Sequence, residues 1–71
     1  MAEKILTFKG MDSWDRPVYE DEAGNLWKDV DPRLNRPAHL CSALNNNFDG
    51  EPDLPFHGTA VFVPERVTWN F

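Results

Sequence analysis

The two histidines and the single cysteine are the residues whose chemistry could serve catalysis or metal binding. His39, Cys41 and His57 carry imidazole and thiol groups, which are the usual ligands of zinc and can form a nucleophile with its base. The spacing supports neither use, because His39 and Cys41 share a face only on a strand and no second cysteine is present. We therefore expect a buried thiol and partly exposed histidines, without a metal or a catalytic residue. A small metal-dependent or thiol enzyme is the least favoured alternative.

A second candidate is the pair Asp29 and Asp31, whose spacing resembles the start of a calcium-binding loop. The resemblance ends there, because Leu34 stands where such a loop has its glycine and Leu40 where it has its bidentate glutamate. The acidic residues at positions 20–22 are predicted to be solvated turn residues. The four glycines are scattered singly, so the sequence has no phosphate-binding glycine loop. The sequence thus predicts no cofactor.

The segment 48–55, Phe-Asp-Gly-Glu-Pro-Asp-Leu-Pro, looks most like a recognition element. Its prolines stiffen the chain, its glycine permits a turn, and the carboxylates of Asp49, Glu51 and Asp53 project from it. Such a segment could present a fixed acidic surface to a basic partner. An ordered loop that merely connects two elements of a sheet is the alternative, and the sequence does not decide between them.

The three tryptophans are expected to divide between the core and a surface that could meet a partner. Trp27 and Trp69 fall on apolar strand faces, which predicts that both belong to the core. Trp14 lies between Ser13 and Asp15 in a connection, so we expect it to be partly exposed and available to a partner.

The elements that must position these residues are mostly strands. Residues 4–9 are rich in strand-forming types, and residues 18–21 and 25–28 read as a hairpin closed by the loop 22–24 with Gly24 in the left-handed position. With that loop, Tyr19 lies opposite Trp27 and Glu20 opposite Leu26. Residues 59–63 predict a strand buried on both faces, and residues 67–71 a half-buried strand that runs to the last residue.

Between these strands the pattern changes. Leu40, Ala43 and Leu44 have helical spacing after Pro37, which predicts one short helix or helical turn between residues 37 and 45. Residues 48–58 contain two glycines and two prolines and predict a loop that Phe48 and Phe56 hold in place. We therefore expect a mainly β, small α+β fold: a bent antiparallel sheet of four to five strands or an SH3-like, partly open barrel, with one short helix or helical turn.

Composition places these elements in a single small domain covering residues 1–71. The chain has a mass of 8.2 kDa, a formal net charge of −5 and 41% hydrophobic residues, which is typical of a small folded protein. No apolar run approaches the roughly 20 residues of a membrane span, and one cysteine suits a reducing compartment, so we expect a cytoplasmic protein without membrane contact. Its basic residues are scattered, which argues against direct nucleic-acid binding.

Two blocks of the sequence also resemble small domains of phage and conjugative elements of gut bacteria. The blocks are residues 8–19, Phe-Lys-Gly-Met-Asp-Ser-Trp-Asp-Arg-Pro-Val-Tyr, and Leu40-Cys41 together with residues 48–55. The resemblance implies a cytoplasmic accessory protein of a mobile element, not a metabolic enzyme. It also implies that the two blocks form one connected set, which contains Asp12, Trp14, Arg16, Gly50, Glu51 and Asp53. A contact from Arg16 to Glu51 or Asp53 would explain why both blocks occur.

The function that these features predict is a small, acidic, non-enzymatic protein-binding module of a mobile element. We expect its binding residues to be Trp14, Arg16, Asp49, Glu51 and Asp53, its partner to be a protein, and the domain itself to be a monomer or a weak dimer. An inhibitor of a host defence nuclease that acts through the acidic surface is the alternative. A subunit that pairs through its terminal strand is a further one.

Overall fold

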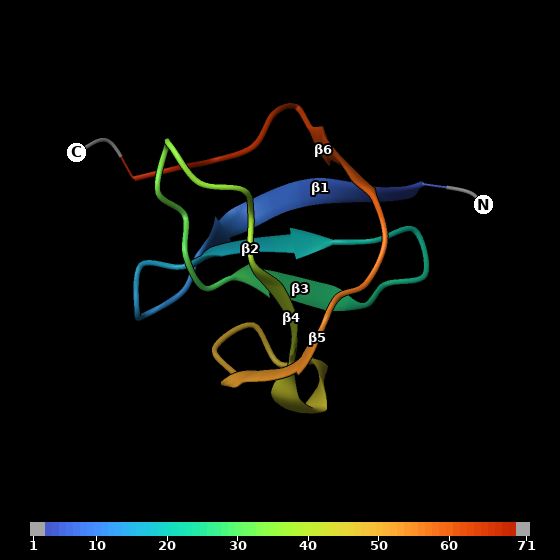
Figure 1. Ribbon diagram of the computed structural model, residues 1–71. Helices are drawn as coiled ribbons and strands as arrows, with labels where there is room; N and C mark the ends of the chain where they lie inside the picture. The colour runs from blue at the N-terminus through green and yellow to red at the C-terminus, as the bar shows by residue number, and fades with distance from the viewer. Residues whose placement is uncertain (1–2, 70–71) are drawn as a thin grey trace.

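The computed structural model describes residues 3–69, in which the dominant element is a single β-sheet (Figure 1). Its strands are β1 (Lys4–Met11), β2 (Pro17–Glu20), β3 (Leu26–Asp29), β4 (Leu40–Ala43), β5 (Pro52–Pro55) and β6 (Ala60–Val63). A 3-10 turn, η1, follows β4 over Leu44–Asn46. Within the described range, no helix is long and apolar enough to cross a membrane.

The sheet has the strand order β5-β4-β3-β2-β1-β6 and is not closed. In Figure 1, β1, β2 and β3 lie side by side, and β4 runs across their direction as the sheet curls. The expected mainly β fold is confirmed, but the described part of the chain has six strands and not four to five. The sheet is also mixed, because β6 is parallel to β1 while the other pairs are antiparallel.

The hairpin of β2 and β3 has the register that its sequence predicts. Tyr19 lies opposite Trp27 and Glu20 opposite Leu26. Gly24 has a φ of 87°, a backbone conformation that glycine adopts without steric cost. The glycine therefore specifies this turn, and the turn sets the pairing of the two strands.

The core is largely aromatic. Leu6, Tyr19 and Leu40 are buried at its centre. The Tyr19 ring packs against Phe62 with a centroid distance of 4.9 Å, and Trp27 packs edge-on against Phe56 at 5.3 Å. Trp27 thus contributes to the core as expected.

The predicted helix at residues 37–45 is wrong over most of its length. Residues 40–43 form β4, and only the short turn η1 follows it, with Asn45 and Asn46 at positive φ. As a strand, this segment pairs with β3 on one side and β5 on the other, and it buries Leu40, Cys41 and Ala43. An isolated helix of two turns is marginal in water, so these two ladders of hydrogen bonds favour the strand.

The predicted loop at residues 48–58 contains β5, an edge strand. Pro52 and Pro55 lack backbone N–H groups, which an edge strand tolerates because one side of it has no partner. The Leu54 N–H donates to Ser42 Oγ at 3.0 Å. The two phenylalanines do hold the segment: Phe56 packs on Trp27, and the Phe48 ring lies over Gly10, where an added Cβ would be 3.3 Å from the ring.

The two strands predicted near the C-terminus also differ from expectation. β6 is partly buried on one face only, because Val61 and Val63 are exposed. Of the strand predicted at residues 67–71, the described part shows one bridge, from Trp69 to Arg33, and residues 70–71 lie outside the described range. Trp69 is partly buried, and its Nε1 donates to the Asp15 carbonyl oxygen at 2.7 Å.

Candidate functional site

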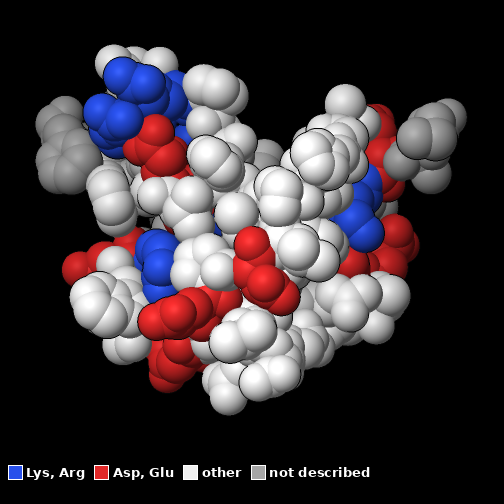
Figure 2. All heavy atoms as spheres, turned by 60° about the horizontal axis from the view of Figure 1, so that its bottom comes forward, with Lys and Arg blue, Asp and Glu red and all other residues white. Residues whose placement is uncertain are grey.

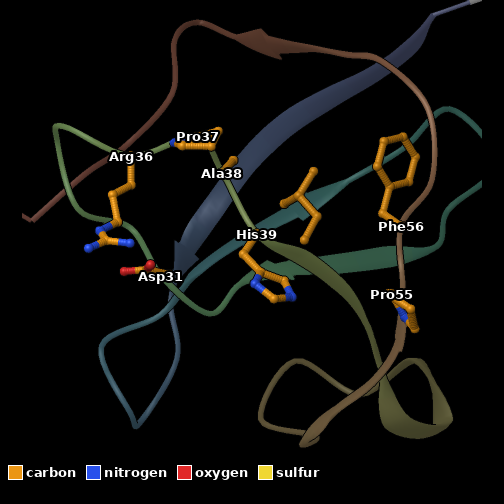
Figure 3. A pocket seen from close by; sticks show the side chains of 8 residues that line it. Asp31, Arg36, Pro37, Ala38, His39, Pro55 and Phe56 are labelled. Atoms are coloured by element: carbon orange, nitrogen blue, oxygen red, sulfur yellow. The ribbon is translucent and has the colours of Figure 1, made fainter.

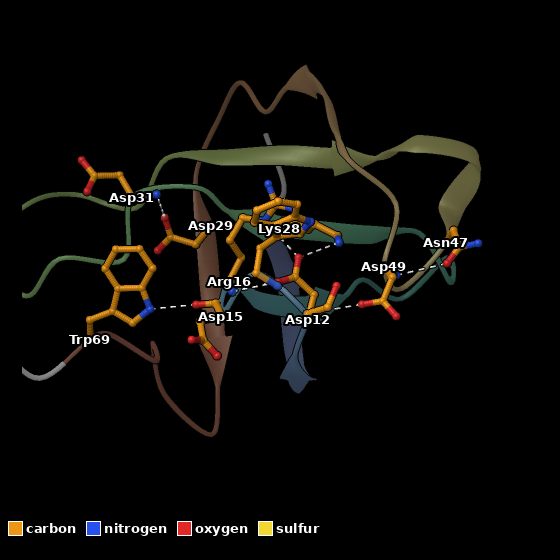
Figure 4. A network of polar contacts seen from close by, with 11 residues as sticks. Asp12, Asp15, Arg16, Lys28, Asp29, Asp31, Asn47, Asp49 and Trp69 are labelled. Carbon is orange, nitrogen blue, oxygen red and sulfur yellow. Dashed lines mark hydrogen bonds and ion pairs between the residues drawn. The ribbon is translucent and has the colours of Figure 1, made fainter.

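The candidate site is built on a tight turn at residues 12–16, between β1 and β2 (Figure 4). The Asp12 N–H donates to the Arg16 carbonyl oxygen and the Asp15 N–H to the Asp12 carbonyl oxygen, both at 3.0 Å. Asp12 Oδ1 accepts hydrogen bonds from the Trp14 and Arg16 N–H groups at 2.9 Å. One carboxylate therefore holds the backbone on both sides of Trp14.

The second oxygen of Asp12 binds two cations. Asp12 Oδ2 lies 2.7 Å from Lys28 Nζ and 3.0 Å from Arg16 Nε, and the side chains of Asp12 and Lys28 are both fully buried. Burial by itself would raise the pKa of the Asp12 carboxyl, but the hydrogen bonds from Lys28 and the turn lower it to about 2. Asp12 is thus ionised at neutral pH and anchors the turn to β3.

Trp14 is the residue that this turn presents. Its side chain is 68% exposed, although its own N–H is fixed by Asp12. The Arg16 guanidinium lies 6.0 Å from the centre of the Trp14 ring. The predicted exposure of Trp14 is therefore confirmed, on backbone that hydrogen bonds hold in place.

The acidic segment is connected to this turn through Asp49. Asp49 Oδ1 accepts a hydrogen bond from the Ser13 N–H at 3.0 Å, and the Asp49 N–H donates to Asn47 Oδ1 at 3.1 Å (Figure 4). Together with the ring of Phe48 over Gly10, this bond joins the two sequence blocks. The structure therefore brings together Trp14, Arg16 and Asp49 of the predicted set.

The specific contact predicted between the blocks is wrong. Arg16 binds Asp12 of its own turn and not Glu51 or Asp53. Glu51 and Asp53 are both exposed; the Glu51 carbonyl oxygen accepts from the Leu44 N–H, and Asp53 lies on β5. These two carboxylates thus extend the acidic surface away from the turn along the edge of the sheet.

The histidine and cysteine side chains are not assembled into a site. Cys41 is buried in β4, and burial raises the pKa of its thiol, so it carries little thiolate at neutral pH. His39 and His57 are exposed. Across residues 3–69, no group of three or more His, Cys, Asp or Glu side chains is placed to hold a metal ion.

Two further aspartates resemble Asp12, and the expectation that Asp21 is a solvated turn residue is wrong. Asp21 is buried and accepts hydrogen bonds from the Ala23 and Asn25 N–H groups and from Trp27 Nε1. These bonds outweigh desolvation and keep its pKa well below the usual value. Asp29 is also buried and accepts from the backbone N–H groups of residues 31 and 39.

A hollow lies elsewhere on the surface, between the segment 36–40 and residues 55–56 (Figure 3). Its volume is about 330 Å³, and Arg36, His39 and Phe56 are among the residues that line it. Figure 2 shows Lys and Arg side chains gathered on the lobe beside a hollow in the surface. This hollow could not be predicted from the sequence, because it forms only where the fold brings residues 36–40 and 55–56 together.

No protein-family model matches the chain, and no curated protein or solved structure is significantly similar to it.

Proposed function

We propose that the protein is a non-enzymatic protein-binding module of a mobile element, acting in the cytoplasm through Trp14 and the acidic side chains beside it. The observation that carries the proposal is a tryptophan that is 68% exposed on a backbone fixed by Asp12. Exposed tryptophans are costly in water and are enriched among the residues that contribute most to binding. A preformed backbone also lowers the entropy cost of binding.

The neighbouring charges support a basic partner surface. Asp49 is bonded to Ser13 directly beside Trp14, and Glu51 and Asp53 follow it as exposed carboxylates. A partner with an apolar pocket for the indole ring and cationic groups around that pocket would complement this surface. An SH3-like, partly open barrel is the form that we propose for the scaffold. The curl of the sheet supports this form, and the parallel strand β6 departs from it.

We favour the binding module over the nuclease inhibitor because of the acidic residues themselves. Asp12, Asp21 and Asp29 are buried and bonded within the protein, so these three carboxylates do not add to a surface that would imitate a nucleic acid.

Affinity capture from a lysate of the source cells tests the proposal. The tagged chain is compared with Trp14→Ala and with Glu51→Gln/Asp53→Asn, and the matched controls are Leu34→Ala, which removes a side chain that is 70% exposed, and Glu22→Gln/Glu65→Gln. We expect one protein that survives nuclease treatment, is retained by both controls and is lost from both site variants. Equal capture by the unaltered chain and all of its variants contradicts the proposal. A captured nuclease that is lost equally from Glu51→Gln/Asp53→Asn and from Glu22→Gln/Glu65→Gln supports the inhibitor instead.

A further inference from the structure

β6 leaves one edge of the sheet open. It stands at the end of the strand order and, within residues 3–69, pairs only with β1. Residues 60–63 are Ala-Val-Phe-Val, and Val61 and Val63 are 41% and 40% exposed. The opposite edge, β5, begins and ends with proline and carries Asp53, which are features that discourage further pairing. The strand β6 itself has none of these features, so its edge can accept another strand.

A groove lies along the inner side of this edge. One part, of about 180 Å³, lies between Ala38 and Leu40 on one side and Ala60 and Phe62 on the other. The hollow described above, of about 330 Å³, continues from Ala38 and Leu40, and Phe56 lines both parts. Figure 3 shows Ala38 and Phe56 on two different segments that line the hollow. The residues that line the narrower part are small or apolar, which suits the apolar side chains of a ligand, whereas the wider part also has the charged residues Asp31 and Arg36.

The far end of the groove has an excess of positive charge. Asp31 lines this end, and Arg33 binds it through Nε at 2.7 Å. Arg36 lines the same end, and in the described part of the chain its guanidinium makes no ion pair. The charges of Arg33 and Arg36 both act on Asp31, which lines this end, so two guanidinium groups share one carboxylate in a protein whose formal net charge is −5. A ligand carboxylate at this end would complete the pairing.

We propose that the groove binds an extended peptide segment of another protein, which adds as a further strand along β6 and places a carboxylate side chain at Arg36. The peptide backbone would bond to the free edge, and alternate apolar side chains would enter the groove between Ala38 and Phe62. A second copy of β6 fits less well, because the nearest following carboxylate, Glu65, lies beyond Pro64, where the strand has ended. This surface shares no residue with the Trp14 site, so the inference goes beyond the proposed function.

Selection from a library of random heptapeptides against the full chain tests the inference, followed by affinity measurement through fluorescence anisotropy. We expect the selected peptides to alternate apolar residues and to contain Asp or Glu near one end. Ala38→Phe fills the groove and weakens their binding by at least about tenfold, because packed atoms must move to admit the peptide. Ala23→Phe, at an exposed position outside the groove, is the matched control and leaves their binding unchanged.

The charge at the end of the groove is tested by a double-mutant cycle. Arg36→Gln weakens a selected peptide by about three- to fivefold, and the effect disappears when the acidic residue of the peptide is changed to its amide. Lys9→Gln, which removes a surface cation paired with Glu20, is the control and has no such coupling.

Ala38 packs against the core, so its substitution can also disturb folding. A measurement on the unaltered chain therefore accompanies these experiments. Binding of a selected peptide to the unaltered chain is expected to shift the amide resonances of residues 36–40 and 60–63. The proposal is overturned if no peptide is selected or if these resonances do not shift. It is also overturned if Trp14→Ala weakens peptide binding and Ala38→Phe does not. It is also overturned if the chain alone forms a dimer that Ala38→Phe or the milder Ala38→Leu abolishes, because the occupant is then a second copy.

Discussion

The turns at residues 12–16 and 21–25 have the same backbone hydrogen bonds but present different side chains to solvent. In each, the first residue is a buried aspartate whose N–H donates to the carbonyl of the fifth residue, and whose carbonyl accepts from the N–H of the fourth. In each, the aspartate carboxylate accepts from the N–H groups of the third and fifth residues and also binds a lysine. The shared bonds define the backbone and leave the third side chain free of any role in the turn.

The difference lies in what the free positions carry. The third residue is Trp14 in one turn and Ala23 in the other, whereas the tryptophan near the second turn, Trp27, points inward and donates to Asp21. The fourth residue is in the left-handed conformation in both turns, but it is Gly24 in one and Asp15, with a φ of 58°, in the other. The residues of the hairpin turn thus suit folding. The other turn has an exposed tryptophan, Trp14, and a non-glycine residue, Asp15, in the left-handed conformation, and these two departures support a role in recognition.

Loss of the two anchoring aspartates should give the largest effects and should separate the turns. Asp12→Ala leaves Lys28 fully buried and unpaired, so we expect a loss of about 3–5 kcal/mol in the free energy of unfolding. Asp21→Ala should cost less, about 1–3 kcal/mol, because the Lys4 side chain is 34% exposed and can be solvated. Urea unfolding measures both. Equal losses would contradict the difference between the turns, and recovery in Asp12→Ala/Lys28→Met would show that the buried charge is the cause.

Acid should weaken the Trp14 turn through Asp12. The pKa of this carboxyl falls from 3.8 to about 2 on folding, so its stabilisation is present above about pH 4 and is lost as the pH falls through about 2. The shift corresponds to about 2 kcal/mol. Asp12→Asn should therefore flatten the decline in unfolding free energy between pH 5 and pH 2 by that amount. A decline as steep as that of the unaltered protein would contradict the assignment.

The left-handed positions should respond in opposite directions to substitution. Gly24→Ala should destabilise the protein by about 1 kcal/mol through backbone strain alone, because nothing lies within 4 Å of the added Cβ. Asp15→Gly should stabilise it by about 0.5–1 kcal/mol, because the strain at a φ of 58° is relieved and the carbonyl that accepts from Trp69 is retained. Thermal unfolding of both variants tests this, and a destabilised Asp15→Gly would show that the side chain of Asp15 contributes to the fold.

The smallest effect on stability is expected at Trp14, whose side chain is largely exposed. Trp14→Ala should change the free energy of unfolding by less than about 0.5 kcal/mol, because the turn is held by Asp12 and not by the indole ring. A loss above about 1 kcal/mol in urea unfolding would indicate that Trp14 serves folding instead of binding.

The same comparison explains how far the sequence predicts the fold. The hairpin could be predicted with its register because Gly24 marks the turn. Its counterpart was missed because Asp15 occupies the position of the glycine, although an aspartate begins both turns and is the signal that could have revealed it. β4 was missed because its four residues fit helical spacing equally well, and only its two neighbouring strands decide the conformation.

The candidate site could be predicted in part for a similar reason. The exposure of Trp14, Asp49, Glu51 and Asp53 follows from local sequence, since each stands in a polar or proline-containing segment. The partner of Arg16 could not be predicted in this way, because Glu51 and Asp53 stood in equally plausible positions in the sequence. Burial of aspartate depends on donors that the fold brings together from distant strands, such as Lys28 for Asp12.

Moving the tryptophan between the two turns tests most directly whether the Trp14 turn is a recognition site. The unaltered chain, Trp14→Ala and Trp14→Ala/Ala23→Trp are compared for capture of the same partner, at equal concentration and after each variant is shown to fold. We predict that both variants lose the partner by at least about tenfold, because Asp49 remains bonded to the turn that lacks the indole ring. Full capture by Trp14→Ala, or its restoration by Ala23→Trp, would contradict the account, because binding would then not depend on the place at which the tryptophan is presented.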